Sequence, residues 1–389
     1  MTPAEKFQLP LEIIQWELTR RCDLRCSMCF LPEEGRRDHE LSFREALDLV
    51  GRFADMGVKE VHLFGGEAYL RRDFLNIVKA VAHRGLSLTF TTGGLNFPVN
   101  DVVEAGEGRI SRIMVSLDGL EPTHDDLRGV AGSFKAGLRC LESAKRAEIP
   151  CGVTTQLNRR TLGDLEILTR LLFLAGIGLW HVQLTEPFGR AVSRFNSLLQ
   201  PYELPAALDV LNRIKLTASK DRVLVKLGNN IGYGTPRCRA LREDVDEVLR
   251  YTSCRQGMNY LAIQSDGRVK GCAACAGGIG PYQSNIRERD LKDIWEDTRE
   301  FGWTRLWSED LLWGFCADCP HRLTCRAGCI QTSQALFGRP GNNPYCDYRV
   351  KSLAERGLRE RIIPDHSSSN SGALFRVLVE KILSPEEGR

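Results

Sequence analysis

Three cysteines near the start of the chain constrain its fold more than any other feature. Cys22, Cys26 and Cys29 are spaced C-x3-C-x2-C and follow directly on an apolar run, 13–18, that has the pattern of a β-strand. Three thiolates this close together can bind one metal centre, whereas a closed structural zinc site takes four ligands. Iron–sulfur cubes are bound by cysteine thiolates, usually four of them. Three thiolates therefore leave one iron open, and an open coordination position indicates chemistry rather than a structural role.

The stretch that carries these cysteines resembles the signature loop of the radical S-adenosylmethionine (radical SAM) enzymes. In that family the open iron is chelated by the amino and carboxylate groups of the methionine part of SAM. An electron from the cluster then splits the sulfonium and produces a 5′-deoxyadenosyl radical. The resemblance implies one [4Fe-4S] cluster on these cysteines and SAM as a cofactor. The alternative is a fragment of a zinc site or a chance group of cysteines.

The composition excludes several classes of protein. The chain has 389 residues, enough for two or three domains. Its 53 basic and 50 acidic residues give a net charge of +3, which argues against a nucleic-acid partner. It has no cleavable signal and no apolar run long enough to span a bilayer. Fourteen cysteines without a secretion signal favour metal binding over disulfides, so we expect a cytoplasmic protein.

Strand-like and helix-like segments alternate over residues 11 to 185. The predicted strands are 13–18, 58–64, 86–92, 110–117, 151–157 and 180–185, and the predicted helices are 43–56, 73–83, 133–147 and 161–175. Ser42 and Glu45 form a capping box before the first helix. Six strands with crossover helices predict an α/β fold with a parallel sheet, open or curled. The family resemblance implies the curled form, a partial (β/α)6 barrel.

The ends of the predicted strands carry polar and glycine-rich motifs, where parallel sheets place their active residues. Gly65, Gly66 and Glu67 follow the second strand. Two glycines allow a ligand to lie against bare backbone, and the glutamate offers a carboxylate to a cation. Alone, this triplet is more often a plain turn. At this distance from the cysteine loop it resembles the GGE motif of radical SAM enzymes, which implies that it holds the amino group of SAM.

A second motif ends the fourth predicted strand. Ser116, Asp118, His124 and Arg128 match an S-x-D-G…H-D…R-G block that resembles radical SAM enzymes with a C-terminal SPASM domain. A serine and an aspartate can hydrogen-bond hydroxyl groups, and an arginine can bind a carboxylate through two parallel hydrogen bonds. The resemblance implies that Ser116 and Arg128 contact the ribose or carboxylate of SAM, and we expect His124 to hold the loop. Gln156, at the end of the fifth strand, can reach the adenosine or belong to a buried network.

The cysteines return in the last third of the chain. Their spacing resembles the seven-cysteine pattern of SPASM domains, which bind auxiliary iron–sulfur clusters. The seven are Cys254, Cys272, Cys316, Cys319, Cys325, Cys329 and Cys346. The alternative is a pair of zinc ribbons, because C-x2-C spacing also suits zinc. Residues 265–269 read Ser-Asp-Gly-Arg-Val and predict a hairpin turn that would bring the first two of these cysteines together.

The family pattern divides these cysteines between two auxiliary [4Fe-4S] clusters. By analogy, Cys316, Cys319, Cys325 and Cys346 bind the second cluster, and Cys254, Cys272 and Cys329 bind the first. The first cluster then lacks a fourth ligand. Cys275 is favoured by its position in the sequence and Cys238 is the other candidate. If neither binds, an open iron is left for a substrate.

The motifs divide the chain into four predicted segments. Residues 1–190 form the radical SAM barrel, 191–250 a bridging helical region, and 251–350 the SPASM domain. Residues 351–389 form a linker and a short apolar helix at 373–383. The first strand begins near residue 11, so recognition of a leader peptide is expected to use another surface or a separate protein.

The preferred hypothesis is an enzyme that abstracts hydrogen from a peptide or small protein, as in thioether or carbon–carbon crosslinking or epimerisation of ribosomal peptides. Its electron donor would be a reduced flavodoxin or ferredoxin. A second hypothesis is dehydrogenation or decarboxylation of a small molecule or cofactor precursor, such as a tetrapyrrole. A third is a non-enzymatic electron carrier or zinc-ribbon module. The sequence identifies no acid or base for the reaction.

Overall fold

The computed structural model describes residues 9–31, 39–220, 223–228, 235–241, 254–274, 284–365 and 375–382. The chain forms two compact units. The first comprises Met1–Thr154, Ile177–Leu179 and Arg255–Trp307, and the second comprises Thr155–Gly176, Trp180–Cys254 and Ser308–Arg389. The units therefore divide the chain differently from the four predicted segments, because part of the cysteine-rich region joins the first unit.

The first unit contains a mostly parallel sheet in the strand order β5-β4-β3-β2-β1-β8-β9. Its strands are β1 (Ile13–Glu17), β2 (Glu60–Phe64), β3 (Ser87–Thr92), β4 (Ile110–Ser116), β5 (Cys151–Leu157), β8 (Tyr260–Ile263) and β9 (Val269–Lys270). Its helices are α1 (Phe43–Asp55), α2 (Phe74–His83), α3 (Val99–Gly106), α4 (Glu121–Arg128), α5 (Ser133–Arg146), α10 (Leu291–Glu296) and α11 (Gly302–Arg305). Strands β1 to β5 pair in parallel in chain order, which confirms the predicted α/β fold.

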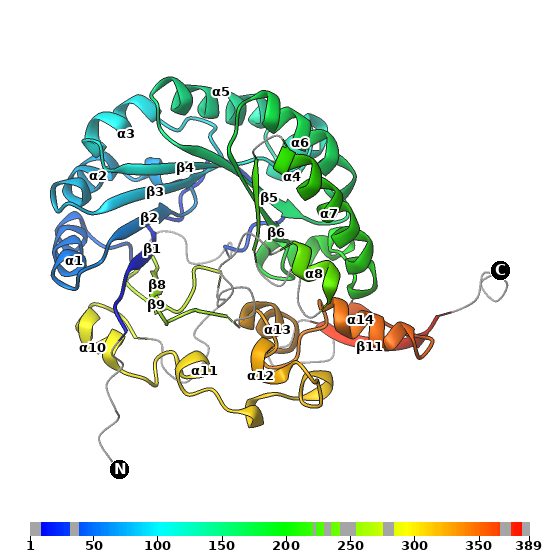
Figure 1. Cartoon of the computed structure of the whole chain (residues 1–389). Coiled ribbons are helices and arrows are strands. Elements are labelled where there is room, and N and C mark those ends of the chain that lie inside the picture. Colours follow the sequence, from blue (N-terminus) through cyan, green and yellow to red (C-terminus); the bar gives the residue numbers. More distant parts are fainter. Residues whose placement is uncertain are drawn as a thin grey trace, which may run out of the picture. The chain divides into compact units, whose positions relative to one another are not determined.

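Each of these helices and strands forms for local reasons. Ser42 and Glu45 make the predicted capping box at the start of α1. The apolar face of α1 packs on the sheet, where Phe53 meets Trp16 edge to face with ring centroids 5.6 Å apart. Figure 1 shows α1, α2, α3 and α5 along one side of the strands β1 to β4.

The two faces of the strands differ in polarity. Leu63, Leu88 and Phe90 have no exposed surface and lie on the face that the helices cover. Successive side chains of a strand point to opposite faces. The alternate positions are half-buried and polar, and they carry Gln15, His62, Thr89 and Thr91. Nε2 of His62 lies 2.8 Å from Oγ1 of Thr91.

The hairpin predicted in the cysteine-rich region is present and extends this sheet. Strands β8 and β9 pair in antiparallel fashion around a turn in which Gly267 has a φ of +87°. A positive φ of this kind favours glycine. Strand β8 then pairs in parallel with β1, with Ile13 opposite Tyr260. The sheet is thereby lengthened by residues from near residue 260.

The second unit contains the rest of the chain. The end of β5 is followed in the sheet by β6 (Leu179–Leu184) and β7 (Leu224–Leu227). Its helices are α6 (Leu165–Leu174), α7 (Leu204–Lys220), α8 (Pro236–Ala240), α12 (Arg322–Cys325), α13 (Ile330–Phe337) and α14 (Asp347–Ala354). Short 3-10 helices of the two units lie at Ala68–Leu70, Leu162–Asp164, Gly189–Ser197, Pro201–Glu203, Glu309–Leu311 and Gly314–Cys316.

The predicted helix at 373–383 is wrong. Phe375–Lys381 is the strand β11, which pairs in antiparallel register with β10 (Leu358–Pro364). The β-branched residues Val377 and Val379 favour a strand. The partner strand supplies the hydrogen bonds that decide between the two forms. The predicted linker, 367–372, lies outside the described residues.

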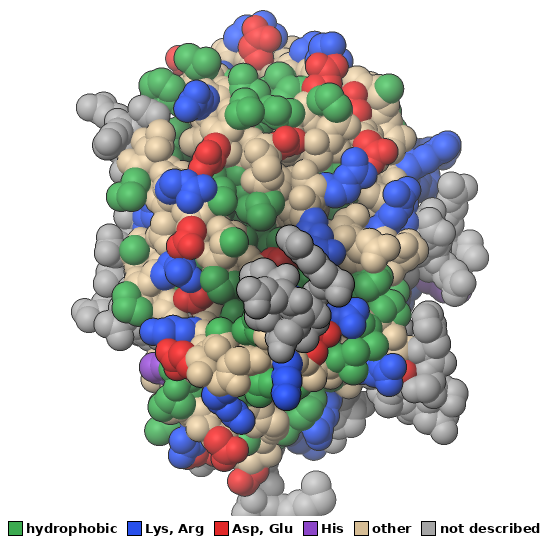
Figure 2. Space-filling view, turned by 90° about the vertical axis from the view of Figure 1, so that its right-hand side faces the viewer, with side chains coloured by type: hydrophobic (Ala, Val, Ile, Leu, Met, Phe, Trp, Pro, Cys, Tyr) green, Lys and Arg blue, Asp and Glu red, His purple; other side chains and the backbone are tan. Residues whose placement is uncertain are grey.

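The surface agrees with the balanced composition. Figure 2 shows basic and acidic side chains interspersed on the face that it draws. In the described parts of the chain, no helix is both long and apolar enough to cross a membrane.

Candidate active site

The loop that carries Cys22, Cys26 and Cys29 is held by the end of helix α4. The backbone N–H of Arg25 donates to the carbonyl of Arg128 at 2.9 Å, and that of Ser27 donates to the carbonyl of Leu127 at 2.8 Å. Gly129 follows with a φ of +68°, and a Cβ there would lie 2.8 Å from the carbonyl oxygen of Arg25. Only glycine fits so close an approach with a positive φ.

The three cysteines of the loop differ in exposure: Cys22 is exposed, Cys29 is half-buried and Cys26 is buried. Loss of water around the sulfur raises the pKa of Cys22 and of Cys26, and the charges of neighbouring thiols raise both further. Neighbouring thiolates repel one another, so the group is stabilised when a cation takes the place of the protons. The donor set therefore fits a thiolate-bound iron–sulfur cluster, as predicted.

The glycines of the Gly-Gly-Glu motif pack against the segment that enters the cysteine loop. The backbone N–H of Gly66 donates to the carbonyl of Thr19 at 2.8 Å, and that of Glu67 donates to the carbonyl of Arg21 at 2.7 Å. A Cβ on Gly65 would lie 2.3 Å from the carbonyl oxygen of Thr19, and one on Gly66 would lie 2.2 Å from that of Arg21. The structure thus gives the two glycines a reason that the sequence did not: they let two chain segments touch.

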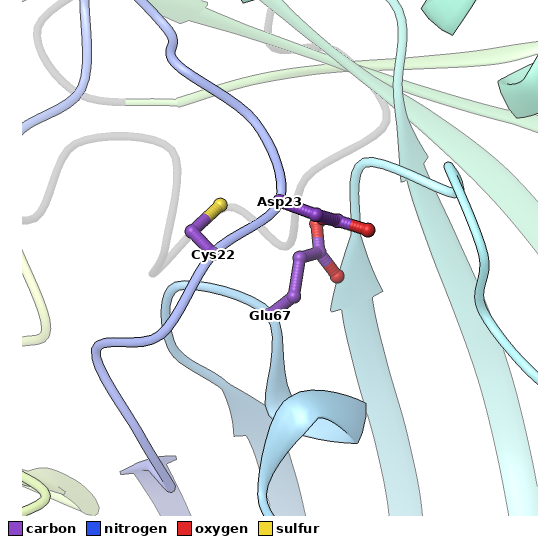
Figure 3. A group of neighbouring side chains, drawn as sticks. All are labelled: Cys22, Asp23 and Glu67. Carbon is purple, nitrogen blue, oxygen red and sulfur yellow. The ribbon is translucent and has the colours of Figure 1, made fainter.

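The same turn places the Glu67 carboxylate beside the cysteine loop. Glu67 is 2% exposed and accepts hydrogen bonds from Oγ1 of Thr92 at 2.6 Å and from the backbone N–H of Gly93 at 2.5 Å. Burial raises its pKa to about 7. Ligand atoms of Cys22, Asp23 and Glu67 all lie within 4.8 Å of one another, and Figure 3 shows the two carboxylates side by side.

Sequence reasoning missed Asp23 and the residues that orient it. Its Oδ2 accepts hydrogen bonds from the hydroxyl of Tyr69 and from Nδ2 of Asn96, the latter at 3.1 Å. Its Oδ1 is buried and accepts no hydrogen bond from any residue that the structure describes. A buried acceptor without a donor is unfavourable. This buried oxygen therefore fits a ligand that brings N–H groups or positive charge, as SAM does. The only signal in the sequence was an acidic residue inside the cysteine motif.

The motif after β4 joins the same site. Asp118 has no exposed surface, and its Oδ2 accepts from Nε of Arg128 at 2.7 Å. Nη1 of Arg128 lies 3.6 Å from Sγ of Cys26. Ser116, the last residue of β4, is 8% exposed. The structure therefore places Arg128 against a cluster cysteine, whereas its contact with SAM stays a prediction.

His124 supports the motif after β4, whereas Gln156 belongs to the other unit. Nδ1 of His124 accepts from the backbone N–H of Asp118 at 2.9 Å, which agrees with the predicted role in holding the loop. Burial lowers the pKa of His124 to about 4. Gln156 belongs to the second unit, where its Nε2 donates to Oε1 of Gln183 at 3.3 Å. Its contact with adenosine stays untested.

The second unit brings one group of four cysteines together. Burial raises the pKa of Cys316, Cys319, Cys325 and Cys346, and the charges of other thiols in the group raise the pKa of Cys316, Cys325 and Cys346 further. These are the four residues predicted to bind the second auxiliary cluster. Four thiols at one place fit a four-iron cluster and equally a zinc ion.

The predicted ligands of the first auxiliary cluster are divided between the units. Cys272 belongs to the first unit, whereas Cys254 and Cys329 belong to the second. Sγ of Cys329 lies 3.6 Å from Oε1 of Glu186. Cys275 lies outside the described residues. Cys238 is 2% exposed and lies 3.8 Å from Oδ2 of Asp347.

Two family models match this chain, one near its start and one in the cysteine-rich region. The family model of the radical SAM superfamily matches residues 16–172, and that of the SPASM iron–sulfur cluster-binding domain matches residues 254–320.

Curated relatives cover nearly the whole chain. The AdoMet-dependent heme synthase of Oleidesulfovibrio alaskensis is 26% identical over 362 residues, which cover 88% of this chain and 89% of that protein. The mycofactocin maturase MftC of Mycolicibacterium smegmatis is 26% identical over 380 residues, which cover 95% and 91%. Among solved structures, Streptococcus suis SuiB bound to S-adenosylmethionine has a TM-score of 0.67 at 20% identity, over 87% of this chain and 77% of that one. This last likeness concerns the fold.

Proposed function

Because the chain belongs to the radical SAM enzymes with a SPASM domain, which use SAM and [4Fe-4S] clusters, we propose that it abstracts a hydrogen atom from a peptide or small protein. The product would be a thioether or carbon–carbon crosslink, or an epimerised residue, in a ribosomally made peptide. We propose a cytoplasmic location and a flavodoxin- or ferredoxin-type electron donor.

The predicted site residues have separate tasks in this proposal. The thiolates of Cys22, Cys26 and Cys29 bind the cluster, which supplies the electron that cleaves SAM to the 5′-deoxyadenosyl radical. Glu67 accepts hydrogen bonds from the amino group of SAM, and the carboxylate of Asp23 lies beside that of Glu67. Gly65 and Gly66 fix that carboxylate relative to the cysteine loop. Ser116, Asp118, Arg128 and Gln156 remain proposed contacts of SAM.

The face of the sheet opposite the covering helices, here called the inner face, supports a peptide as the substrate. Gln15, His62, Thr89 and Thr91 alternate with the fully buried side chains of β1, β2 and β3. Their amide, imidazole and hydroxyl groups suit the N–H and C=O groups of a peptide. The relative MftC, named as a maturase, aligns over 95% of this chain.

A second candidate is decarboxylation or dehydrogenation of a tetrapyrrole. The observation that favours it is the 26% identity to the AdoMet-dependent heme synthase of O. alaskensis. A substrate with several carboxylates would call for cationic side chains around it. Arg112, opposite Thr89, and Lys270, opposite Ala262, lie on the same face and could provide such contacts. We rank this candidate second because the alignment with the maturase MftC covers more of this chain, 95% against 88%.

The two candidates differ in what binds and what reacts. Anaerobically reconstituted enzyme, SAM and dithionite would be incubated either with synthetic peptides that match short open reading frames near the gene or with iron coproporphyrin III. We expect 5′-deoxyadenosine to rise with the peptide. The peptide mass should fall by about two hydrogens if a crosslink forms, or stay unchanged with one residue of inverted configuration if the product is an epimer. Loss of carbon dioxide from the porphyrin, with no change in the peptide, would overturn the proposal in favour of the second candidate.

A further inference from the structure

We propose that Arg128 sets the reduction potential of the cluster bound by Cys22, Cys26 and Cys29, by donating a hydrogen bond to the sulfur of Cys26. The inference rests on the proposed function only in that this loop binds the cluster. It makes Arg128 a positioning and tuning residue for the electron that cleaves SAM.

The geometry of the guanidinium supports this assignment. Nε and Nη2 of Arg128 lie 2.7 and 2.5 Å from the same oxygen of Asp118. Nη1 points the other way and lies 3.6 Å from Sγ of Cys26. The side chain of Arg128 is 12% exposed and that of Asp118 is 0% exposed. Asp118 thus holds one edge of the planar group and turns its remaining nitrogen to the thiol.

The surrounding backbone fixes both partners of this contact. The carbonyls of Leu127 and Arg128 accept the N–H groups of Ser27 and Arg25, on either side of Cys26 in the sequence. A glycine at 129 permits that approach. On the other side, His124 accepts the backbone N–H of Asp118 and is itself 1% exposed. The guanidinium and the thiol are therefore held together by main-chain bonds as well as by their own contact.

Electrostatics gives the direction of the effect. A reduced cluster carries one more negative charge than an oxidised one, so a hydrogen bond and a positive charge at a ligand sulfur stabilise the reduced form. Arg128 should raise the reduction potential. The carboxylate of Asp118 partly offsets that charge and should lower it.

The test uses variants that change the charge in opposite directions. Arg128→Gln removes the positive charge and keeps a donor, Asp118→Asn removes the negative charge and keeps an acceptor, and Arg139→Gln removes an exposed arginine of α5. The cluster on Cys22, Cys26 and Cys29 would be studied in a background where Cys254, Cys316 and Cys325 are replaced by Ala, which removes the EPR signals of the two auxiliary clusters. Its potential would be measured by anaerobic redox titration followed by EPR, without SAM, alongside iron content and SAM affinity.

We expect a more negative potential in Arg128→Gln, a less negative one in Asp118→Asn, and no change in Arg139→Gln. An unchanged potential in both buried variants, with only the SAM affinity of Arg128→Gln reduced, would overturn the inference and make Arg128 a SAM ligand. If one buried variant fails to bind iron, the sign of the shift in the other decides. If the variants show these shifts but the wild-type enzyme modifies neither the peptide nor the porphyrin, the proposed function is overturned and the inference about Arg128 stands.

Discussion

A carboxylate oxygen of Asp23 lies within 4.8 Å of a carboxylate oxygen of Glu67. Burial is the main reason that the pKa of Glu67 is raised to about 7, and the charge of Asp23 adds to it. A buried carboxylate this close to a second carboxylate is stabilised by a proton or a cation between them. The raised pKa of Glu67 should therefore be measurable before any cofactor binds.

The protein without cluster and SAM should become less stable as the pH rises from 4.5 to about 7. Glu67 has a pKa of about 7 when folded and an ordinary value of 4.5. The folded state then binds more protons than the unfolded state between these values, so the free energy of unfolding falls as the pH rises from 4.5 to 7. Replacing Glu67 by Gln removes this term, and at pH above 7 the variant should gain up to about 3 kcal/mol relative to wild type.

Urea unfolding of the metal-free, reduced protein at several pH values would check this prediction. Glu104→Gln, on the exposed face of α3, is the matched control and should follow wild type. If the free energy of unfolding of Glu67→Gln depends on pH in the same way as that of wild type, Glu67 has an ordinary pKa.

His124 should have the opposite effect on stability. Burial lowers its pKa to about 4 from 6.5, so the folded state binds fewer protons than the unfolded state in that interval. The stability that it contributes is complete above pH 6.5 and is lost as the pH falls toward 4. In His124→Asn the amide oxygen can still accept from Asp118. We expect that variant to resist acid better than wild type, by up to about 3 kcal/mol near pH 4 in urea unfolding. An unchanged acid limb would contradict a neutral buried His124.

The local parts of the site could be predicted from the sequence, because neighbours in the chain fix them. The cysteine spacing and the Gly-Gly-Glu turn each lie within one loop at the end of one strand. The bond between Tyr69 and Asp23 could not be predicted, since it joins positions 46 residues apart. Only the packing of the sheet brings these two residues together.

The same distinction explains the errors in the fold. The pairing of β8 with β1 joins residues near 13 and 260, and no local pattern reports such a contact. Residues 375–381 have apolar positions compatible with either a helix or a strand, and their pairing with β10 decides for the strand. Local periodicity identified most strands of the first unit because each is followed by a helix that covers it.

Replacing Cys26 by Ala should abolish SAM cleavage. Cys26 is one of three thiols available to the cluster, and two thiolates would hold it poorly. Chromatographic analysis of 5′-deoxyadenosine after incubation with SAM and dithionite would measure the loss. Cys151→Ser changes a half-buried cysteine at the start of β5 and should keep activity. Turnover retained in Cys26→Ala would mean that the reactive centre lies elsewhere.

The metal content should distinguish iron clusters from zinc. Three four-iron clusters predict about twelve irons per chain after anaerobic reconstitution. Cys325→Ala should reduce this by about four, because it removes one of the four thiols that lie together in the second unit. Elemental analysis with Mössbauer spectroscopy would count the irons. About two zinc ions and little iron would contradict the cluster assignment and favour zinc ribbons.

The fourth ligand of the first auxiliary cluster is the last testable residue, and we expect it to be Cys275. Cys238 already has polar partners: Oγ1 of Thr235 donates to its sulfur at 3.2 Å, and Asp347 lies 3.8 Å away. The charge of Cys238 also helps to raise the pKa of Cys346, which is a predicted ligand of the second auxiliary cluster.

Binding of Cys238 to the first cluster would break that buried network, whereas Cys275 is three positions from the predicted ligand Cys272. Cys275→Ser should therefore change the EPR spectrum of the first auxiliary cluster, and Cys238→Ser should leave it as in wild type. The reverse pattern would assign Cys238 to the cluster. Two unchanged spectra would mean that neither cysteine binds and that the fourth iron is open to a substrate.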